Sequence, residues 1–278
     1  MAKKMVKMRY NGVFFEVSHY PQMYRKPGEP EAVRSAREKV TTDIKKRINA
    51  RESRLNLMRT AHANYIGGRD LFVTLHFCRD LSLPDGRKLV DKFHRLMRKE
   101  YAQQWKKLPA DEKRRRHRRN EDGEYRWLCT WEDHKSTGEP VDLHFHFFMS
   151  RCPLHRVDML QLIIRMWQQA AGTYCGSVNV RTLDASDLFE DTARYFLKQR
   201  KKAGVKRWTK SRNHKPARKP VYKRIPENDI PDCPPGCKWI DGDIRPNEFG
   251  VYGWAICRIV DKRVFKRWWN RQLKDAEN

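Results

Sequence analysis

The sequence contains no long apolar run. No segment approaches the roughly 18 consecutive apolar residues that a membrane-spanning helix requires. The first residues, MAKKMVKMRYNG, also lack the apolar stretch of a signal peptide. These absences argue against a membrane protein and against a secreted one. We therefore expect a cytoplasmic protein without a membrane partner.

Acidic residues are scarce relative to basic ones. The 278 residues include 60 Lys and Arg but only 34 Asp and Glu, which gives a formal net charge of +26, spread along the chain. A surplus of this size predicts a polyanionic partner, because each phosphate contact releases condensed counterions. Nucleic acid fits this prediction better than a membrane surface does. The simpler alternative is a soluble protein that is merely basic.

Cysteines with a metal-binding spacing are few. Among the seven cysteines only Cys233 and Cys237, in CPPGCKW, are spaced as metal ligands can be, and no second Cys or His pair lies close by in the sequence. In a protein that is not secreted we expect reduced thiols. The segment is interpreted as a Pro/Gly-rich turn, with a structural zinc site as the alternative.

Hydrophobic periodicity predicts alternating helices and strands. In chain order we expect a helix over 31–65, a strand over 70–77, a helix over 87–107, strands over 125–132 and 141–150, a helix over 156–171, a strand over 176–183 and a helix over 186–204. The charged segment DEKRRRHRRNEDGE is expected to be a loop. The order over 70–183 is β-α-β-β-α-β, which predicts an α+β fold with the ferredoxin-like split pattern. In that pattern an antiparallel sheet carries both helices on one face and leaves the other face open for a ligand.

These elements divide the chain into three expected parts. Residues 1–66 form a basic N-terminal helical extension and residues 67–204 form the core. Residues 205–278 form a basic, Pro-rich loop and an aromatic, basic region that includes the predicted helix KRVFKRWWNRQLK and that can pack on the core. The composition of the two outer parts is compatible with a cover for the sheet, a reader of nucleic-acid sequence or an oligomer contact.

Two histidines lie one residue apart in the apolar run VDLHFHFFMS, residues 141–150. Because side chains alternate along a strand, His144 and His146 point to one face, and the apolar residues around them point to the other. Two imidazoles on one face are compatible with a metal site, a solvated polar face or a nucleic-acid surface.

A carboxylate ends the neighbouring strand of the predicted hairpin. Glu132 and two neutral imidazoles would make a three-ligand site for a divalent cation with positions left open. The register of the hairpin is open at this point, and a slip of one residue would reverse the face of Glu132. Asp133 and Asp142 are therefore the alternative carboxylates.

A tyrosine and a lysine share one face of the last predicted helix. Tyr195 and Lys198, in RYFLKQRKK, are three residues apart. A phenol has a pKa of about 10 and is a poor nucleophile by itself. Facing a metal-polarised phosphodiester, it can attack phosphorus and form a phosphotyrosine. The alternative is that Tyr195 packs beside Phe196 and that Lys198 is a solvated charge.

Taken together, FVTLHF, HFHFF with Glu132, and YFLK resemble the three motifs of HUH endonucleases. The likeness is to rolling-circle replication initiators of small phages and plasmids, of the filamentous-phage and microvirus type. It spans residues 50–215, with RLNLMRTAHANYIGGRDLFVTLHF and RWTKSRN as flanking segments. The resemblance implies that His144, His146 and Glu132 bind Mg²⁺ or Mn²⁺. It also implies Tyr195 as the nucleophile and Lys198 as the catalytic lysine of the Y-x-x-K motif.

The resemblance also implies a substrate and partners. The expected reaction is site- and strand-specific nicking of single-stranded or hairpin origin DNA through a covalent 5′-phosphotyrosine, which starts rolling-circle replication in the cytoplasm of a bacterial host. A host polymerase would extend the 3′ hydroxyl. A host helicase would unwind the template, because no G-x-x-x-x-G-K-[ST] loop is present. The residues expected to contact DNA, by phosphate pairing and base stacking, are Arg200, Lys201, Lys202, Arg207, Trp208, Lys210 and Arg212.

Two positions depart from the family pattern. The first motif usually reads T-L-T, and here His76 replaces the second threonine, which makes His76 an extra ligand or a DNA contact. Only one tyrosine occupies the third motif. Termination would then need a second subunit, a water-mediated step or another nucleophile, and the oligomeric state stays open.

Two other classes of function share these features. A non-catalytic RNA- or DNA-binding module can have the same element order, as in RNA-recognition domains. No segment clearly matches K/R-G-F/Y-G/A-F-V-x-F/Y, however, and histidines occupy positions where stacking aromatics are needed. A transposase or conjugative relaxase has the same kind of site. Relaxases usually place the tyrosine before the histidines, whereas here it follows them.

Overall fold

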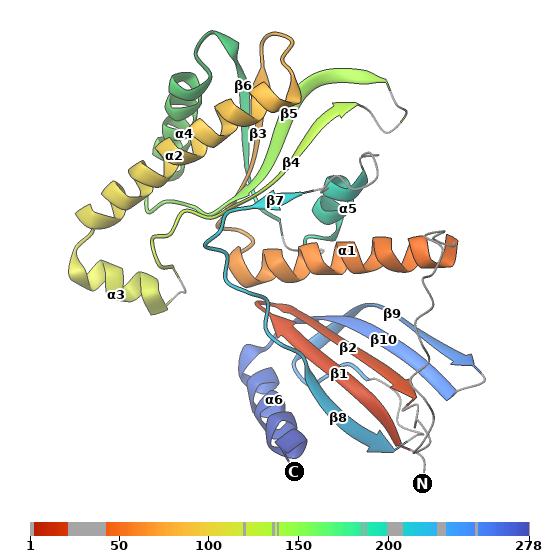
Figure 1. The fold of residues 1–278 in the computed structure, drawn as a ribbon. Helices are drawn as coiled ribbons and strands as arrows, with labels where there is room; N and C mark the ends of the chain where they lie inside the picture. The colour runs from red at the N-terminus through yellow and green to blue at the C-terminus, as the bar shows by residue number, and fades with distance from the viewer. Residues whose placement is uncertain are drawn as a thin grey trace, which may run out of the picture. The chain divides into compact units, whose positions relative to one another are not determined.

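The computed structural model describes residues 3–21, 43–118, 121–134, 137, 139–184, 186, 188–198, 208–226, 232–247 and 250–277. The chain divides into two compact units (Figure 1). Unit 1 comprises Met1–Ala63 and Pro216–Asn278, and unit 2 comprises Asn64–Lys215. Over the described residues the fold is α+β, with two five-stranded antiparallel sheets and six α-helices. None of these helices is long and apolar enough to cross a membrane.

The sheet of unit 2 has the strand order β6-β3-β5-β4-β7, and each neighbouring pair is antiparallel. Its strands are β3 (Leu71–Phe77), β4 (Trp127–His134), β5 (Pro140–Met149), β6 (Cys175–Thr182) and β7 (Thr209–Lys210). Its helices are α2 (Leu83–Lys107), α3 (Ala110–Arg118), α4 (Arg156–Ala171) and α5 (Glu190–Lys198). The helices and strands predicted over 70–183 are confirmed, with small differences at their ends.

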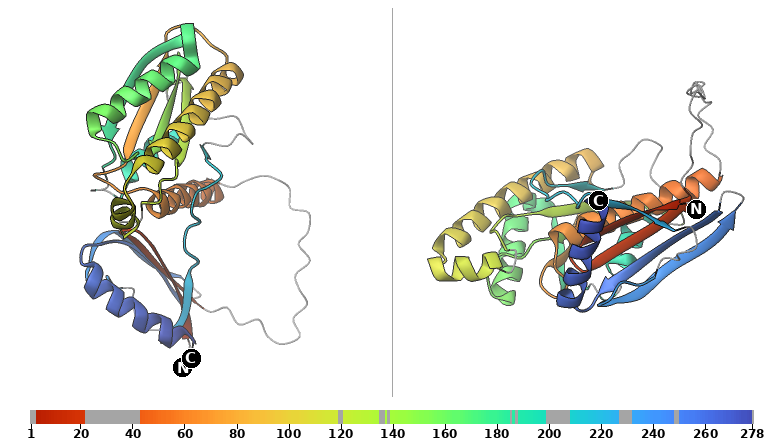
Figure 2. Two further views of the ribbon diagram at one scale, coloured as in Figure 1. Left: turned by 90° about the vertical axis from the view of Figure 1, so that its left-hand side faces the viewer. Right: turned by 90° about the horizontal axis from the view of Figure 1, so that it is seen from below.

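Alternation along the strands separates the two faces of this sheet. Val73, Phe145 and Phe147 are buried in a core that also contains Trp167 of α4 and Phe93 of α2. Figure 2 shows α2 and α4 side by side on this face. Burial of each such side chain contributes about 1.5–3 kcal/mol. The residues between these apolar positions therefore point to the opposite face, which α2 and α4 leave uncovered.

The charged segment predicted as a loop is partly helical. Within α3, Arg115 pairs with Asp111 at 2.7 Å and Arg116 pairs with Glu112 at 2.9 Å. Ion pairs four residues apart stabilise a helix that buries no side chain of its own. The loop prediction is wrong for α3, because charges of opposite sign at helical spacing support a helix without a core.

The sheet of unit 1 has the strand order β8-β1-β2-β10-β9 and is also antiparallel throughout. Its strands are β1 (Lys3–Asn11), β2 (Phe14–Pro21), β8 (Val221–Pro226), β9 (Cys237–Asn247) and β10 (Gly250–Ile259). Its helices are α1 (Asp43–Asn64) and α6 (Lys262–Glu277). The predicted C-terminal helix is thus confirmed as α6.

The two faces of the unit 1 sheet differ in polarity. On one face Phe15 packs against Phe265 and Trp269 of α6, with ring centroids 5.5 Å and 6.3 Å apart. Residues of the other parity face α1, where the Arg59 guanidinium donates to both carboxylate oxygens of Glu16, at 2.8 Å and 2.7 Å. α6 therefore covers apolar side chains, whereas α1 covers a face that carries Glu16 as well as the buried Phe14, whose ring stacks on that of His62.

The structure divides the chain differently from the predicted boundaries 1–66, 67–204 and 205–278. Residues 3–21 form two strands, so the prediction of a helical extension is wrong there, and the part of the predicted helix over 31–42 lies outside the described residues. The residues from Pro216 onward form one unit with the N-terminal residues. The cause is strand pairing, because β1 pairs with β8 and β2 pairs with β10.

Candidate metal and tyrosine site

The registers of three neighbouring strands bring polar side chains together on the face of the unit 2 sheet that lies opposite α2 and α4. His144 of β5 lies opposite Glu132 of β4 and opposite His76 of β3. His146 of β5 lies opposite Thr74 of β3. Because directly opposite residues of an antiparallel pair share a face, these five side chains project to the same side of the sheet.

A β-bulge determines the partner of Glu132. Near the turn His134 pairs with Pro140, and a regular ladder from there would place Asp142 opposite Glu132. The observed partner is His144, two residues further on. A shift of two keeps each side chain on its face, whereas a shift of one would reverse it. This register brings Glu132, rather than Asp133 or Asp142, to the histidines.

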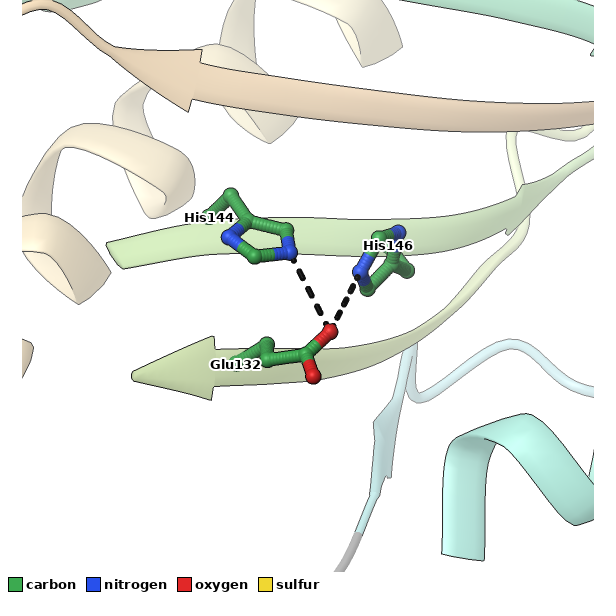
Figure 3. A group of neighbouring side chains, drawn as sticks. All are labelled: Glu132, His144 and His146. Atoms are coloured by element: carbon green, nitrogen blue, oxygen red, sulfur yellow. Dashed lines mark hydrogen bonds and ion pairs between the residues drawn. The ribbon is translucent and has the colours of Figure 1, made fainter. Parts of the chain in front are cut away.

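Glu132, His144 and His146 form a compact group of ligand atoms (Figure 3). Glu132 Oε2 lies 3.2 Å from His144 Nε2 and 3.6 Å from His146 Nε2. All three atoms lie within 4.8 Å of one another, and among the described residues no other three His, Cys, Asp or Glu side chains meet this closely. Adjacent ligands of an octahedral site, each about 2.1 Å from the metal, are about 3 Å apart. The spacing therefore suits a divalent cation.

The second nitrogen of each imidazole is held by a neighbouring group. His144 Nδ1 donates to the backbone carbonyl of Asp142 at 2.7 Å, and His146 Nδ1 lies 3.0 Å from the Thr74 hydroxyl. A neutral His144 that donates from Nδ1 has only a lone pair at Nε2, and this lone pair faces a carboxylate oxygen. A bound cation satisfies both acceptors at once, so the residues present fit a divalent metal.

Burial keeps His146 in its neutral form. It lowers the pKa of His146 to about 3, and the nearby His144, His76 and Arg181 act in the same direction. Near neutral pH this imidazole is therefore unprotonated at one nitrogen, which is the form that binds metals.

Tyr195 reaches the same atoms from α5. Its hydroxyl donates to Glu132 Oε2 at 2.9 Å and lies 2.8 Å from His146 Nε2. Burial raises the pKa of Tyr195 above its ordinary value, and the hydrogen bond to Glu132 and the charge of that carboxylate raise it further. Arg181 acts in the opposite direction. Beside the carboxylate alone, the phenol stays protonated at neutral pH.

The approach to α5 fixes the position of Tyr195. Leu188 and Phe189 precede the helix with φ angles of 61° and 63°, a left-handed conformation that costs about 1–2 kcal/mol per residue. Both side chains are fully buried, as is Phe196, and the rings of Phe189 and Phe196 contact Phe148 of the sheet. Burial of these side chains offsets the strain, and it holds the helix against the face that carries the histidines.

His76 lies beside the ligand group and not in it. Its ring stacks on that of His144, with centroids 4.9 Å apart and planes 18° from parallel. Burial lowers the pKa of His76, and the positive form of His144 lowers it further. The prediction of an extra ligand is thus not supported by this arrangement, and the predicted DNA contact stays a prediction.

The predicted DNA-contacting residues are only partly described. Outside the described residues lie Arg200, Lys201, Lys202 and Arg207. Lys198 is the last residue of α5, but its side chain is outside the described part of the structure. Trp208 is half-buried, and Lys210 and Arg212 are exposed. Lys210 belongs to β7, which pairs with β4, so it lies on the sheet that carries the ligand group.

Sequence reasoning misses Thr74 and Arg181. Thr74 contacts the far nitrogen of His146, and Arg181 of β6 contributes a positive charge near His146 and Tyr195. Strand alternation in FVTLHF and GSVNVRTL puts these residues on defined faces. Only the strand order β6-β3-β5 places them next to the histidines.

Cys233 and Cys237 flank a turn, as predicted. Gly236 has a φ of 79°, and the N–H of Cys237 donates to the carbonyl of Pro234 at 3.0 Å. All seven cysteines are free thiols. Neither Cys233 nor Cys237 belongs to a close group of three metal-binding side chains among the described residues.

Comparison with family models, with curated proteins and with solved structures finds no match to this chain. Its function is therefore inferred from the residues that the fold brings together.

Proposed function

We propose that unit 2 is a metal-dependent HUH-type endonuclease that nicks single-stranded DNA at a replication origin. The observation that carries the proposal is the position of the Tyr195 hydroxyl, 2.8 Å from His146 Nε2 and 2.9 Å from Glu132 Oε2. Packing alone gives a tyrosine no reason to end beside three converging metal-ligand atoms from two other elements. A nucleophile that attacks a metal-polarised phosphate needs this position.

The arrangement of the elements supports the proposal. The order β3-α2-β4-β5-α4-β6, with α3 added, supports the ferredoxin-like split pattern that we propose for unit 2. On this scaffold the three segments that resemble HUH motifs fall on β3, on β5 with β4, and on α5. The first two lie on adjacent strands, and the third meets them through Tyr195.

Mg²⁺ or Mn²⁺ is the cofactor that we infer. Glu132, His144 and His146 would hold it, and two imidazoles with one carboxylate leave positions open for substrate oxygens. When bound, the cation supplies polarisation of the scissile phosphate and neutralises its charge. The chain's own residues keep both imidazoles oriented for this role through Asp142 and Thr74.

In the proposed reaction the Tyr195 oxygen attacks the phosphorus of a phosphodiester. A bond forms between Tyr195 Oη and phosphorus, and the bond from phosphorus to the O3′ of the preceding nucleotide breaks. The phenolic proton passes to solvent and O3′ takes up a proton. The 5′ phosphate remains on Tyr195 and the 3′ hydroxyl becomes a primer for a host polymerase. Attack by a 3′ hydroxyl on the phosphotyrosine reverses the step and rejoins a strand.

The DNA would lie over the ligand group, on the sheet face opposite α2 and α4. Lys198 follows Tyr195 by three residues and is proposed to neutralise the phosphate, while the exposed Lys210 and Arg212 bind the backbone. A host helicase would supply unwinding. A transposase or relaxase has the same chemistry, and the DNA sequence that is cut distinguishes it from an initiator.

A non-catalytic RNA-recognition module has less support on this face. Such modules stack bases on exposed aromatic rings of the sheet. Here Phe72 and Phe148 are 5% and 1% exposed and contact Phe196 of α5. The positions nearest the ligand group carry imidazoles and a carboxylate instead.

The proposal is tested by looking for a covalent protein–DNA adduct. Single-stranded oligonucleotides that tile candidate origins are incubated with the protein and Mn²⁺ and separated on a denaturing gel. A 5′-phosphotyrosine retains a label placed at the 3′ end of the oligonucleotide, whereas a label at the 5′ end is released on a fragment with a 3′ hydroxyl.

The decisive variant is Tyr195→Phe, which should abolish the adduct. Tyr222→Phe is the matched control and should keep it, because Tyr222 is 46% exposed on β8 of unit 1. The assignment fails if the adduct persists in Tyr195→Phe or if it carries the 5′ label. Absence of an adduct with the unmodified protein on every tiled origin would favour the binding module.

A further inference from the structure

The outer face of α6 carries a row of exposed cations. Six of its sixteen residues are Lys or Arg, and its two acids lie in the last turn. Arg263, Arg267, Arg271 and Lys274 follow one another at steps of four, four and three, which aligns them along one side of the helix. All four are exposed.

These cations differ from those of α3, which occur at a higher density. In α3, Arg115 and Arg116 both pair with acids one turn away. In α6, Arg263, Arg267 and Arg271 form no ion pair with any residue that the structure describes. Three exposed arginines on one side of a helix, without an ion pair among the described residues, are complementary to a polyanion.

The first turn of α6 adds to this imbalance. Lys262 and Arg263 lie there, and the helix has no acid in that turn. Cations at a helix N-terminus are disfavoured by the helix dipole. Asp261 caps the helix by accepting from the N–H groups of Arg263 and Val264, at 2.8 Å and 3.0 Å. The Asp261 carboxylate attracts Arg263, but the helix dipole itself gives no reason for cations in the first turn, whereas an anionic ligand does.

The aromatic residues of α6 indicate which kind of nucleic acid fits. Phe265, Trp268 and Trp269 all pack against Phe15 of the sheet. Proteins that bind single strands offer aromatic rings on which bases stack, and here all three rings of the helix face inward. The outward face presents charge alone, which suits the phosphate backbone of a duplex.

We propose that the exposed face of α6 binds the phosphate backbone of duplex DNA without sequence preference. It borders an open pocket that provides a concave wall for a backbone and is lined by Pro235, Val264, Arg267, Asn270, Arg271 and Lys274. The face lies in unit 1, on residues that take no part in the proposed nicking chemistry. Duplex binding by α6 is therefore measurable without a nick, and it stands or falls separately from the nuclease.

The test measures duplex affinity against salt concentration. The full chain is titrated onto a fluorescent duplex of about 20 base pairs and arbitrary sequence, at several NaCl concentrations. The variant Arg267→Gln with Arg271→Gln and Lys274→Gln removes three charges and keeps residues that favour a helix. Its matched control, Lys92→Gln with Arg95→Gln and Lys99→Gln, removes three exposed charges from α2.

We expect the α6 variant to bind duplex about tenfold more weakly at low salt. The slope of log affinity against log salt should become shallower by about 2–3, since each phosphate contact contributes about 0.9. The α2 variant should stay within about twofold of the unmodified protein. An unchanged slope in the α6 variant, or an equal loss in the α2 variant, overturns the proposal.

Two further measurements distinguish duplex DNA from other anionic ligands. Binding to a single strand of equal length and to vesicles that contain an anionic lipid is compared for the same variants. A loss confined to the single strand or to the vesicles, with duplex binding retained, also overturns the proposal. Adduct formation by Tyr195 on a short single-stranded oligonucleotide should be the same in the α6 variant as in the unmodified protein.

Discussion

The two units are built alike and use their polar sheet faces differently. Each has a five-stranded antiparallel sheet with helices packed on an apolar face. On the polar face of unit 1, Glu16 lies between Arg9 and Arg59, at 2.9 Å and 2.7 Å. On the polar face of unit 2, Glu132 Oε2 instead lies 3.2 Å from His144 Nε2, within a group of three metal-ligand atoms. Ion pairs between opposite charges stabilise a fold, whereas converging ligand atoms form a site for a cation.

Removal of the metal ligands should have the largest effect on activity. If it had no effect, the contrast between the polar faces of the two units would be wrong. We expect His144→Ala with His146→Ala to lower the rate of adduct formation at least about 10³-fold, because polarisation by the cation is lost. Mn²⁺ binding, followed by calorimetry, should disappear as well. His155→Ala is the control, since this exposed histidine at the start of α4 makes no side-chain cap hydrogen bond. Wild-type Mn²⁺ affinity in the double variant would place the metal elsewhere.

Loss of the ion pairs on the polar face of unit 1 should lower the free energy of unfolding. Glu16→Gln leaves Arg9 and Arg59 without their shared anion, on side chains that are 14% and 10% exposed. We expect a loss of about 3 kcal/mol in the free energy of unfolding, measured by urea titration. Asp111→Asn breaks an ion pair whose side chains are about 60% exposed and should cause no measurable loss. Equal losses in the two variants would show that the unit 1 face is not held by its ion pairs.

Buried neutral imidazoles should make unit 2 sensitive to acid. Burial lowers the pKa of His214 to about 4, and its Nε2 lies 2.9 Å from the Tyr65 hydroxyl. A group whose pKa is lowered on folding stabilises the protein above its unfolded pKa of about 6.5, and this contribution is lost as the pH falls toward 4. Between about pH 7.5 and pH 5 the loss should be about 2 kcal/mol.

The measurement compares urea unfolding of the unmodified protein and of His214→Gln at both pH values. Gln keeps a hydrogen-bonding side chain but does not titrate, so the variant should lose about 2 kcal/mol less on acidification. A fall in stability of the same size in both proteins would assign the acid sensitivity to other groups.

The parts of the site that were predicted depend on local periodicity. Period two put His144 and His146 on one face, and the helix pattern identified Tyr195, because both are properties of a few consecutive residues. The partner of Glu132 depends on a bulge near the turn, which sequence alternation does not reveal. The position of Tyr195 against the sheet depends on two residues in the left-handed conformation, 188 and 189, neither of which is glycine.

The set of segments that form unit 1 was also not predictable from local sequence patterns. Alternation in KKMVKMRYN is visible in the sequence, yet its partner strand begins at Val221, and Val6 pairs with Lys223. Strand propensity is local, whereas pairing depends on which edges are free after the rest of the chain has folded. The predicted three-part division failed at this point, because nothing in either terminus identifies the other.

Substitution of Thr74 should have the smallest effect of these changes. It tests most directly how the polar face of unit 2 differs from that of unit 1. In unit 1 a carboxylate is held by cations, whereas in unit 2 the His146 ring is held by a neutral hydroxyl at 3.0 Å. Thr74→Val keeps the shape and removes the hydroxyl, so we expect Mn²⁺ affinity to fall about tenfold, as is typical when a group behind a metal ligand is lost. Thr74→Ser restores the hydroxyl and should recover most of that affinity, with calorimetry as the measurement. Because Val and Ser differ in both packing and hydrogen bonding, Thr74→Ala completes the set. If the Ser and Ala variants bind Mn²⁺ equally well, the hydroxyl does not orient His146, and the ring is held by its other contacts, with Phe72 and Tyr195.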